Sequence, residues 1–178
     1  MPIPDLIGEP VPYWLPPGTH PCTPVEVEAR FVYNEQRQKV WRYFMYVLDR
    51  IKDLGGRVNE VLIDGSVVTV RALPGDVDAA CLVPPAELRA LLQDAENARA
   101  LNFFLSQPHL ARELLGVHLF VVRNRENLDG FRLTFSRGLG GTGLREADPL
   151  KDPPGLIVPE EKGILAVDFT SFFTAVPT

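Results

Sequence analysis

The most informative motif in this chain of 178 residues is LIDGS at 62–66, which is followed after nine residues by DVD at 76–78. Residues i and i+2 of a strand point to the same side of a sheet, so Asp76 and Asp78 present two carboxylates together while Val77 faces a core. Neighbouring carboxylates repel each other, and a divalent cation that takes oxygen ligands relieves this repulsion. The spacing therefore predicts that Asp76 and Asp78 bind Mg²⁺ or Mn²⁺.

Gly65 and Ser66 lie between this strand and a helical turn that we expect within 67–71. Backbone N–H groups and the helix dipole at such a position favour an anion, glycine permits a close approach, and Ser66 adds a hydroxyl donor. Arg71 follows, where its charge either reaches a phosphate or stays in solvent. A phosphate-binding turn beside a carboxylate pair is typical of phosphoryl and nucleotidyl transfer. The competing interpretation of Asp76 and Asp78 is a solvated turn at a strand entrance.

The composition narrows the class of protein. An apolar content of 46% in a chain of this length supports a buried core, and about 150 residues per domain predicts a single domain. Nothing approaches the roughly 20 consecutive apolar residues of a membrane span, and the N-terminus lacks the pattern of a signal peptide. With two cysteines, Cys22 and Cys81, we expect reduced thiols and a cytoplasmic protein. A net charge of −5 disfavours nucleic acid as a partner.

Around the motif, the pattern predicts an α/β (α+β) fold with a small mixed β-sheet flanked by helices. Eight of the 17 prolines fall in the first 24 residues, so we expect residues 1–22 to form an extended arm without regular structure. Residues 23–178 then form one domain with a long Gly/Pro-rich loop at 136–162. The expected helices are 24–31, 35–54 and, in two pieces, 85–105; the expected strands are 58–63, 76–83, 117–122, 131–135 and 164–169.

Residues 63–83 resemble the nucleotidyltransferase superfamily of the DNA polymerase beta type, whose signature is a hydrophobic strand, Gly-Ser, a short gap and Asp-x-Asp in an apolar strand. The resemblance extends over residues 15–122, where LPPGTH at 15–20 and the two helices after it are similar to small bacterial nucleotidyltransferase-like proteins. Those proteins are similar to the minimal nucleotidyltransferases of toxin–antitoxin pairs. The resemblance implies that Gly65 and Ser66 hold a nucleoside triphosphate (NTP) and that Asp76 and Asp78 hold Mg²⁺.

The same family usually has a third carboxylate on a neighbouring strand, and the corresponding residue here is His118. Imidazole works as a base near neutral pH but is a poor ligand for Mg²⁺. Three alternatives stay open: His118 substitutes for the carboxylate, Asp168 on the last expected strand supplies it, or the chain has lost catalysis. Without such roles, His118 is a hydrogen-bonded strand residue and Asp168 an outward aspartate at a strand end.

The resemblance implies a metal-dependent nucleotidyltransferase that moves a nucleoside monophosphate from an NTP to an acceptor hydroxyl. The acidic net charge ranks a protein or small-molecule acceptor above RNA. The alternative is an inactive nucleotidyltransferase-like module that sequesters a protein partner. A phosphatase or hydrolase that uses the same aspartates has no further motif in its favour. GLGGTG at 138–143 fits G-x-G-x-x-G, but three prolines shortly after it prevent the helix that a dinucleotide site needs, and a mobile loop is the better interpretation.

Overall fold

A five-stranded mixed sheet forms the centre of the computed structural model, which describes residues 2–93, 99, 103, 107–138, 144 and 146–174. The strands are β1 (Gly18–Cys22), β2 (Glu60–Asp64), β3 (Val77–Leu82), β4 (Val117–Val122) and β5 (Gly163–Asp168). Their order is β1-β5-β2-β3-β4. The middle strand β2 runs antiparallel to β5 and β3, whereas β1 pairs with β5 and β3 with β4 in parallel.

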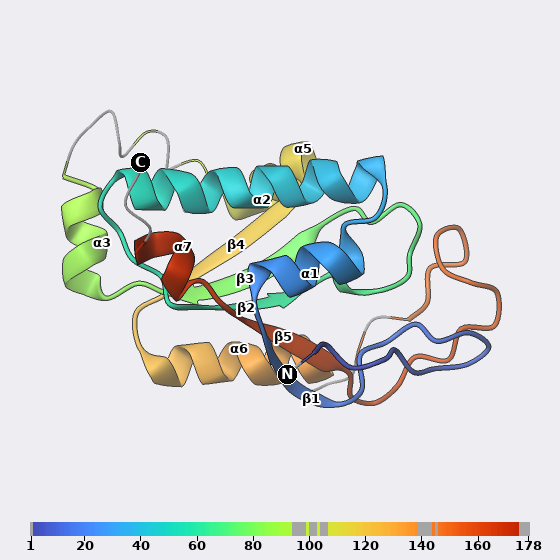
Figure 1. The fold of residues 1–178 in the computed structure, drawn as a ribbon. Helices are drawn as coiled ribbons and strands as arrows, with labels where there is room; N and C mark the ends of the chain where they lie inside the picture. Colours follow the sequence, from blue (N-terminus) through green and yellow to red (C-terminus); the bar gives the residue numbers. More distant parts are fainter. Residues whose placement is uncertain are drawn as a thin grey trace.

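Helices cover both faces of this sheet (Figure 1). In the described residues they are α1 (Pro24–Phe31), α2 (Glu35–Asp53), α3 (Pro85–Leu91), α5 (Pro108–Leu115), α6 (Arg125–Arg137) and α7 (Thr170–Thr174). Helices α1, α2 and α7 lie on one face and α6 on the other (Figure 1). The α+β class and the small mixed sheet flanked by helices are therefore confirmed.

The first two helices begin and end where local chemistry predicts. Thr23 caps α1 and forms a reciprocal capping box with Glu26, and Asn34 caps α2 through the backbone N–H of Arg37. The chain leaves α2 at Gly55, whose φ of +78° suits glycine. The apolar stripe expected on α2 is buried: Val40, Trp41, Phe44, Val47, Leu48 and Ile51.

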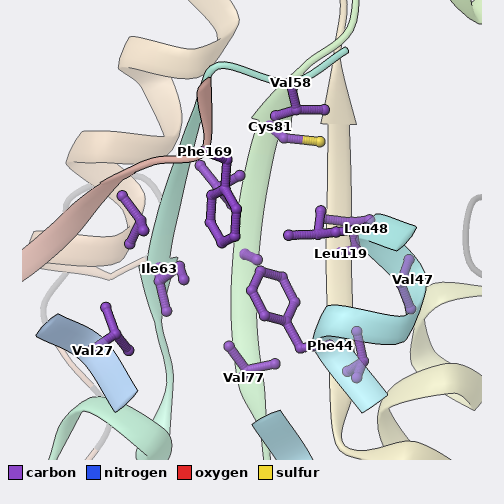
Figure 2. Packing of buried hydrophobic residues seen from close by; sticks show 14 of the residues in the cluster. Val27, Phe44, Val47, Leu48, Val58, Ile63, Val77, Cys81, Leu119 and Phe169 are labelled. Carbon is purple, nitrogen blue, oxygen red and sulfur yellow. The ribbon is translucent and has the colours of Figure 1, made fainter. Parts of the chain in front are cut away.

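The main core fills the space between α2 and the sheet. Figure 2 shows Phe44 and Leu48 of α2 facing Ile63, Leu119 and Phe169. A second, smaller cluster lies under α6 and includes alternate residues of the same strands. Side chains therefore alternate between two buried faces along β2 and β3, as expected for central strands covered on both sides.

The strand expected at 131–135 is wrong, because these residues belong to α6. Asn124 caps this helix by accepting a hydrogen bond from Asn127 N at 2.8 Å. Leu128, Phe131 and Phe135 then recur at helical spacing and pack on the sheet. The run at 131–135 is too short to show the helical spacing. The N-cap at Asn124, where the helix begins, lies outside this run.

Two other expected segments differ from the structure. The arm at 1–22 contains strand β1, and its Pro21 is tolerated because β1 is an edge strand. The helical turn expected at 67–71 is a single 3₁₀ turn, η1 (Ser66–Val68). Most of the second helical piece within 85–105 lies outside the described residues, as do 139–143 of the expected loop at 136–162.

No helix within the described ranges is long and apolar enough to span a bilayer.

Candidate functional site

Three polar side chains form one row across neighbouring strands. Asp64 of β2 is paired in register with Asp78 of β3, and Asp78 is paired with His118 of β4. Alternation along each strand puts all three on the face that α6 partly covers, because Leu62 and Ala80 of that face belong to the cluster under α6. The structure therefore brings the predicted residues Asp78 and His118 together and adds Asp64.

His118 contacts Asp78 directly. Its Nδ1 lies 2.9 Å from Asp78 Oδ1, and the side chain is almost fully buried. The ring packs on Phe120, with a centroid distance of 4.2 Å, and Nε2 is buried with no hydrogen-bond partner in the described part of the chain. His118 thus orients one oxygen of Asp78, in agreement with the hydrogen-bonded strand histidine that the sequence allowed.

Asp76 is held by Ser66 and Arg112. Its Oδ1 accepts hydrogen bonds from Ser66 Oγ at 2.8 Å and Ser66 N at 3.2 Å, and its Oδ2 accepts from Arg112 Nε at 2.7 Å. Burial raises the pKa of Asp76, but the charge of Arg112 and the hydrogen bonds from Arg112 and Ser66 outweigh burial and bring the pKa below its ordinary value. Asp76 is therefore an ionised carboxylate with both oxygens engaged.

The Gly65-Ser66 turn packs against the two aspartates. Gly65 has φ +88° and ψ −175°, a conformation that only glycine adopts readily, and an added Cβ would lie 2.8 Å from Asp78 N. Ser66 Oγ also accepts a hydrogen bond from Gly75 N at 2.9 Å. The hydroxyl expected to face a phosphate thus positions Asp76, and a single 3₁₀ turn supplies little helix dipole.

A buried arginine holds the chain after this turn. The guanidinium of Arg37 in α2 donates to the carbonyl oxygens of Val67, Thr69 and Arg71, each at 2.6 Å. Arg37 is fully buried, and sequence reasoning missed it. A charged residue in the first turn of an amphipathic helix looks like a surface residue, so its role is visible only once the loop at 67–71 is in place.

Asp64 is a site residue that sequence reasoning also missed. It forms an ion pair with Lys162, and each of the two side chains is only 10% exposed. Burial raises the pKa of Asp64, the charge and hydrogen bond of Lys162 act against this, and the resulting pKa is about 6. The strand expected at 58–63 ends one residue before Asp64, whereas β2 includes Asp64 and pairs it with Asp78.

Arg71 and Asp168 have other partners. Arg71 Nε donates to Asp152 Oδ1 at 2.9 Å, and the same oxygen accepts from Tyr13 Oη at 2.6 Å. Asp168 pairs in register with Glu60, at the opposite end of β2 from Asp64, and its Oδ1 accepts from Thr170 N. Strand β5 runs antiparallel to β2, so Asp168 lies at the opposite end of the sheet from Asp64 and Asp78. Asp168 is therefore wrong as the third carboxylate.

A pocket of about 200 Å³ opens above these residues. It is lined by Tyr13, Trp14, Asp64, Gly65, Ser66, Thr69, Arg71, Asp76, Asp78, Arg112, Leu144, Glu146, Ala147, Asp152 and Lys162. The described lining contains five carboxylates and three cationic side chains, a formal excess of two negative charges. Such a pocket attracts a divalent cation and repels a free polyanion.

The pocket contains two neighbouring carboxylates, Asp76 and Asp78, and carboxylate oxygen is a type of ligand that Mg²⁺ takes. Within the described residues, no group of three or more His, Cys, Asp or Glu side chains is arranged to hold a metal ion. Mg²⁺ in nucleotide sites is, however, usually held by one or two carboxylates together with substrate phosphates and water. Asp76 and Asp78 supply such a pair, and Asp78 Oδ2 has no hydrogen-bond donor among the described residues.

A family model, described as a family of unknown function (DUF6932), matches residues 11–148. The chain belongs to this family. The part that matches DUF6932 contains both aspartates of the DVD motif, the Gly65-Ser66 turn and Arg112, whereas Lys162 and Asp152 lie beyond it. Comparison with curated proteins and with solved structures gave no match.

Proposed function

We propose that this chain is a nucleotidyltransferase that binds a Mg²⁺–NTP complex in the pocket and transfers a nucleoside monophosphate to an acceptor hydroxyl. The acceptor oxygen forms a bond to the α-phosphorus and releases its proton to water, while the bond from that phosphorus to the bridging oxygen breaks and pyrophosphate leaves. The observation that carries the proposal is the composition of the pocket. A carboxylate pair and an excess of two negative charges stand beside cations suited to phosphate.

The charge of the pocket argues for the cation and the nucleotide together. An NTP alone is a polyanion, and a pocket with more carboxylates than cations repels it. A Mg²⁺ ion held by Asp76 and Asp78 would neutralise charge on the phosphates during transfer. Arg112 and Lys162 line the same pocket and supply N–H donors for phosphate oxygens. Ser66 and His118 orient the two aspartates.

Calorimetric titration of each NTP, with Mg²⁺ and with EDTA, tests binding. We expect binding with Mg²⁺ only, and its loss in the double variant Asp76→Asn/Asp78→Asn. Asp168→Asn is the control, because it makes the same kind of substitution, with loss of one negative charge, at the other end of the sheet. A folded wild-type protein that binds no NTP contradicts the proposal.

Transfer is tested with NTPs that carry ³²P at the α or the γ position, incubated with protein and small-molecule fractions as acceptors. Nucleotidyl transfer moves the α label and releases the γ label in pyrophosphate. Label transferred from the γ position indicates a kinase and contradicts the proposal. The Asp76→Asn/Asp78→Asn variant, expected to transfer neither label, controls for activity carried in the fractions.

A second candidate is the inactive binding module, and His118 favours it. This histidine stands beside Asp78 where the resemblance leads us to expect a carboxylate. In this alternative the pocket holds a nucleotide without transferring it, and a protein partner binds elsewhere with an affinity that survives Asp76→Ala/Asp78→Ala. If the wild type binds Mg²⁺–NTP without transfer and His118→Asp restores transfer, the module is the correct assignment.

A further inference from the structure

One wall of the pocket is built by two segments that are far apart in the sequence. The N-terminal segment, residues 2–17, and a second segment, residues 144 and 146–162, lie side by side at one end of the sheet, in dark blue and orange (Figure 1). Ile157 N donates to Glu9 O at 3.0 Å, which ties the two segments together. Both contribute to the pocket lining: Tyr13 and Trp14 come from the first, and Leu144, Glu146, Ala147 and Asp152 from the second.

Trp14 is the half-buried aromatic side chain of this wall. Its ring lies at the edge of Tyr13, with a centroid distance of 4.7 Å and an interplanar angle of 64°. Its Nε1 donates to Ile157 O at 3.2 Å, and its backbone pairs with Ile7. Tyr13, in contrast, is 1% exposed and uses its hydroxyl on Asp152. Trp14 is therefore held from both segments with part of its surface open to the pocket.

Trp14 also lies beside Lys162, a charged residue of the pocket. Lys162 Nζ lies 5.7 Å from a centroid of the indole, within the range of a cation–π contact, and the same lysine pairs with Asp64. An aromatic surface thus adjoins a cation that is suited to phosphate. A nucleotide has the matching division, with a flat heterocycle at one end and phosphates at the other.

We propose that Trp14 is the platform on which the nucleobase stacks, with the triphosphate directed toward Lys162 and Arg112. This inference rests on the proposed function and adds the place of the base. Every nucleobase has a π face, so stacking on an indole provides affinity with little choice between bases. The ring is already oriented by its neighbours, so little side-chain entropy is lost when the base binds.

The test compares two ligands that differ by the nucleoside, Mg²⁺–ATP and Mg²⁺–tripolyphosphate, by calorimetry on the full chain. Trp14→Ala is expected to weaken ATP binding about 5- to 150-fold, the usual range for one base–aromatic stack. Tripolyphosphate binding should stay unchanged, because it has no base. Trp14→Phe keeps an aromatic face and should retain most of the ATP affinity.

Tryptophan fluorescence supplies a second readout that needs no alanine variant. The other tryptophan, Trp41, is 4% exposed in the core, so a change in emission on ATP binding should come from Trp14 and vanish in Trp14→Phe. ATP binding that leaves wild-type emission unchanged, or that Trp14→Ala weakens no more than tripolyphosphate binding, overturns the platform but leaves the proposed function intact. A wild type that binds neither ligand overturns both.

Discussion

At the scale of single residues, the three neighbouring carboxylates of the pocket each have a different partner. Asp76 contacts Arg112, Asp78 contacts His118, and Asp64 contacts Lys162. The partners do not produce the same result. The pKa of Asp76 lies below its ordinary value, whereas burial raises the pKa of Asp64 to about 6. Both side chains are buried, but Asp76 accepts hydrogen bonds from Ser66 as well as from Arg112, and these outweigh its burial.

Asp64 should make folding stability depend on pH. Its pKa of about 6 in the folded chain exceeds the ordinary value of 3.8, so the folded state binds the proton more tightly than the unfolded state. This contribution to stability is complete below the ordinary pKa and is lost as the pH rises through about 6. Urea denaturation from pH 4 to pH 7 should show wild type losing stability relative to Asp64→Asn over that window.

Asp168→Asn is the control with the opposite sign. Hydrogen bonds from the side chain and the backbone N–H of Thr170 hold the pKa of Asp168 below its ordinary value. Its contribution is therefore present above the ordinary pKa and lost as the pH falls. The raised pKa of Asp64 is contradicted if the stability difference between wild type and Asp64→Asn does not change from pH 4 to pH 7. It is also contradicted if wild type gains stability relative to Asp64→Asn as the pH rises.

At the scale of elements, helix α2 determines the shape of the loop that follows Gly65. Its Arg37 reaches through the core and binds three carbonyl oxygens of that loop, as well as the Phe31 carbonyl at the end of α1. Burial lowers the pKa of Arg37, and its interactions with Tyr33 and Tyr13 act against this effect. The loop is thus attached to α2 by one side chain.

Replacement of Arg37 by methionine should therefore be strongly destabilising. It leaves several buried carbonyl groups without donors, at about 1–3 kcal/mol each, so the expected loss in the free energy of unfolding is about 3–5 kcal/mol. Arg37→Lys keeps the charge but has fewer hydrogen-bond donors, so its free energy of unfolding should lie between those of wild type and Arg37→Met. Urea denaturation gives the values, and Arg57→Met, at an exposed position, should change stability by less than about 0.5 kcal/mol. Equal effects of the two methionine variants would falsify the role of Arg37.

Elements with strong local signals were predicted well. The capping box at Thr23, the apolar stripe of α2 and the apolar run of β4, which only His118 interrupts, each depend on residues close together in the sequence. Residues 131–135 were predicted wrongly as a strand, because so short an apolar run is compatible with a helix as well as with a strand. Strand β1 was not predicted, because the high density of proline argued against regular structure. An edge strand tolerates proline, since only one of its sides needs backbone N–H donors.

At the scale of the whole molecule, Asp152 fastens the wall of the pocket. It accepts hydrogen bonds from Tyr13 of the N-terminal segment and from Arg71 of the loop after η1. Three segments far apart in the sequence thus meet at one carboxylate. Because the Asp152 side chain is only 5% exposed, water competes little for these bonds.

Asp152→Ala should release the N-terminal segment. Donors of Tyr13, Arg71 and Asp148 lose their acceptor. Limited proteolysis should therefore cut within residues 2–17 faster than in wild type. The expected loss of stability is about 1–3 kcal/mol. Asp5→Ala is the matched control, since its ion pair with Arg30 is exposed and such pairs contribute about 0–1 kcal/mol. Proteolysis rates that rise equally in both variants speak against the fastening role.

The sequence alone determined the secondary elements with local signals, the α+β class and the closeness of Gly65, Ser66, Asp76 and Asp78. These features depend on caps, periodicity and spacing within about twenty residues, where chain geometry leaves few alternatives. Only the tertiary structure decided the partners of those aspartates. Strand order places Asp64 and His118 beside Asp78 and sends Asp168 to the other end. Arg112 lies 36 residues from its partner Asp76, and Lys162 lies 98 residues from its partner Asp64. Contacts of that separation depend on the register and packing of the whole sheet, which no local pattern records.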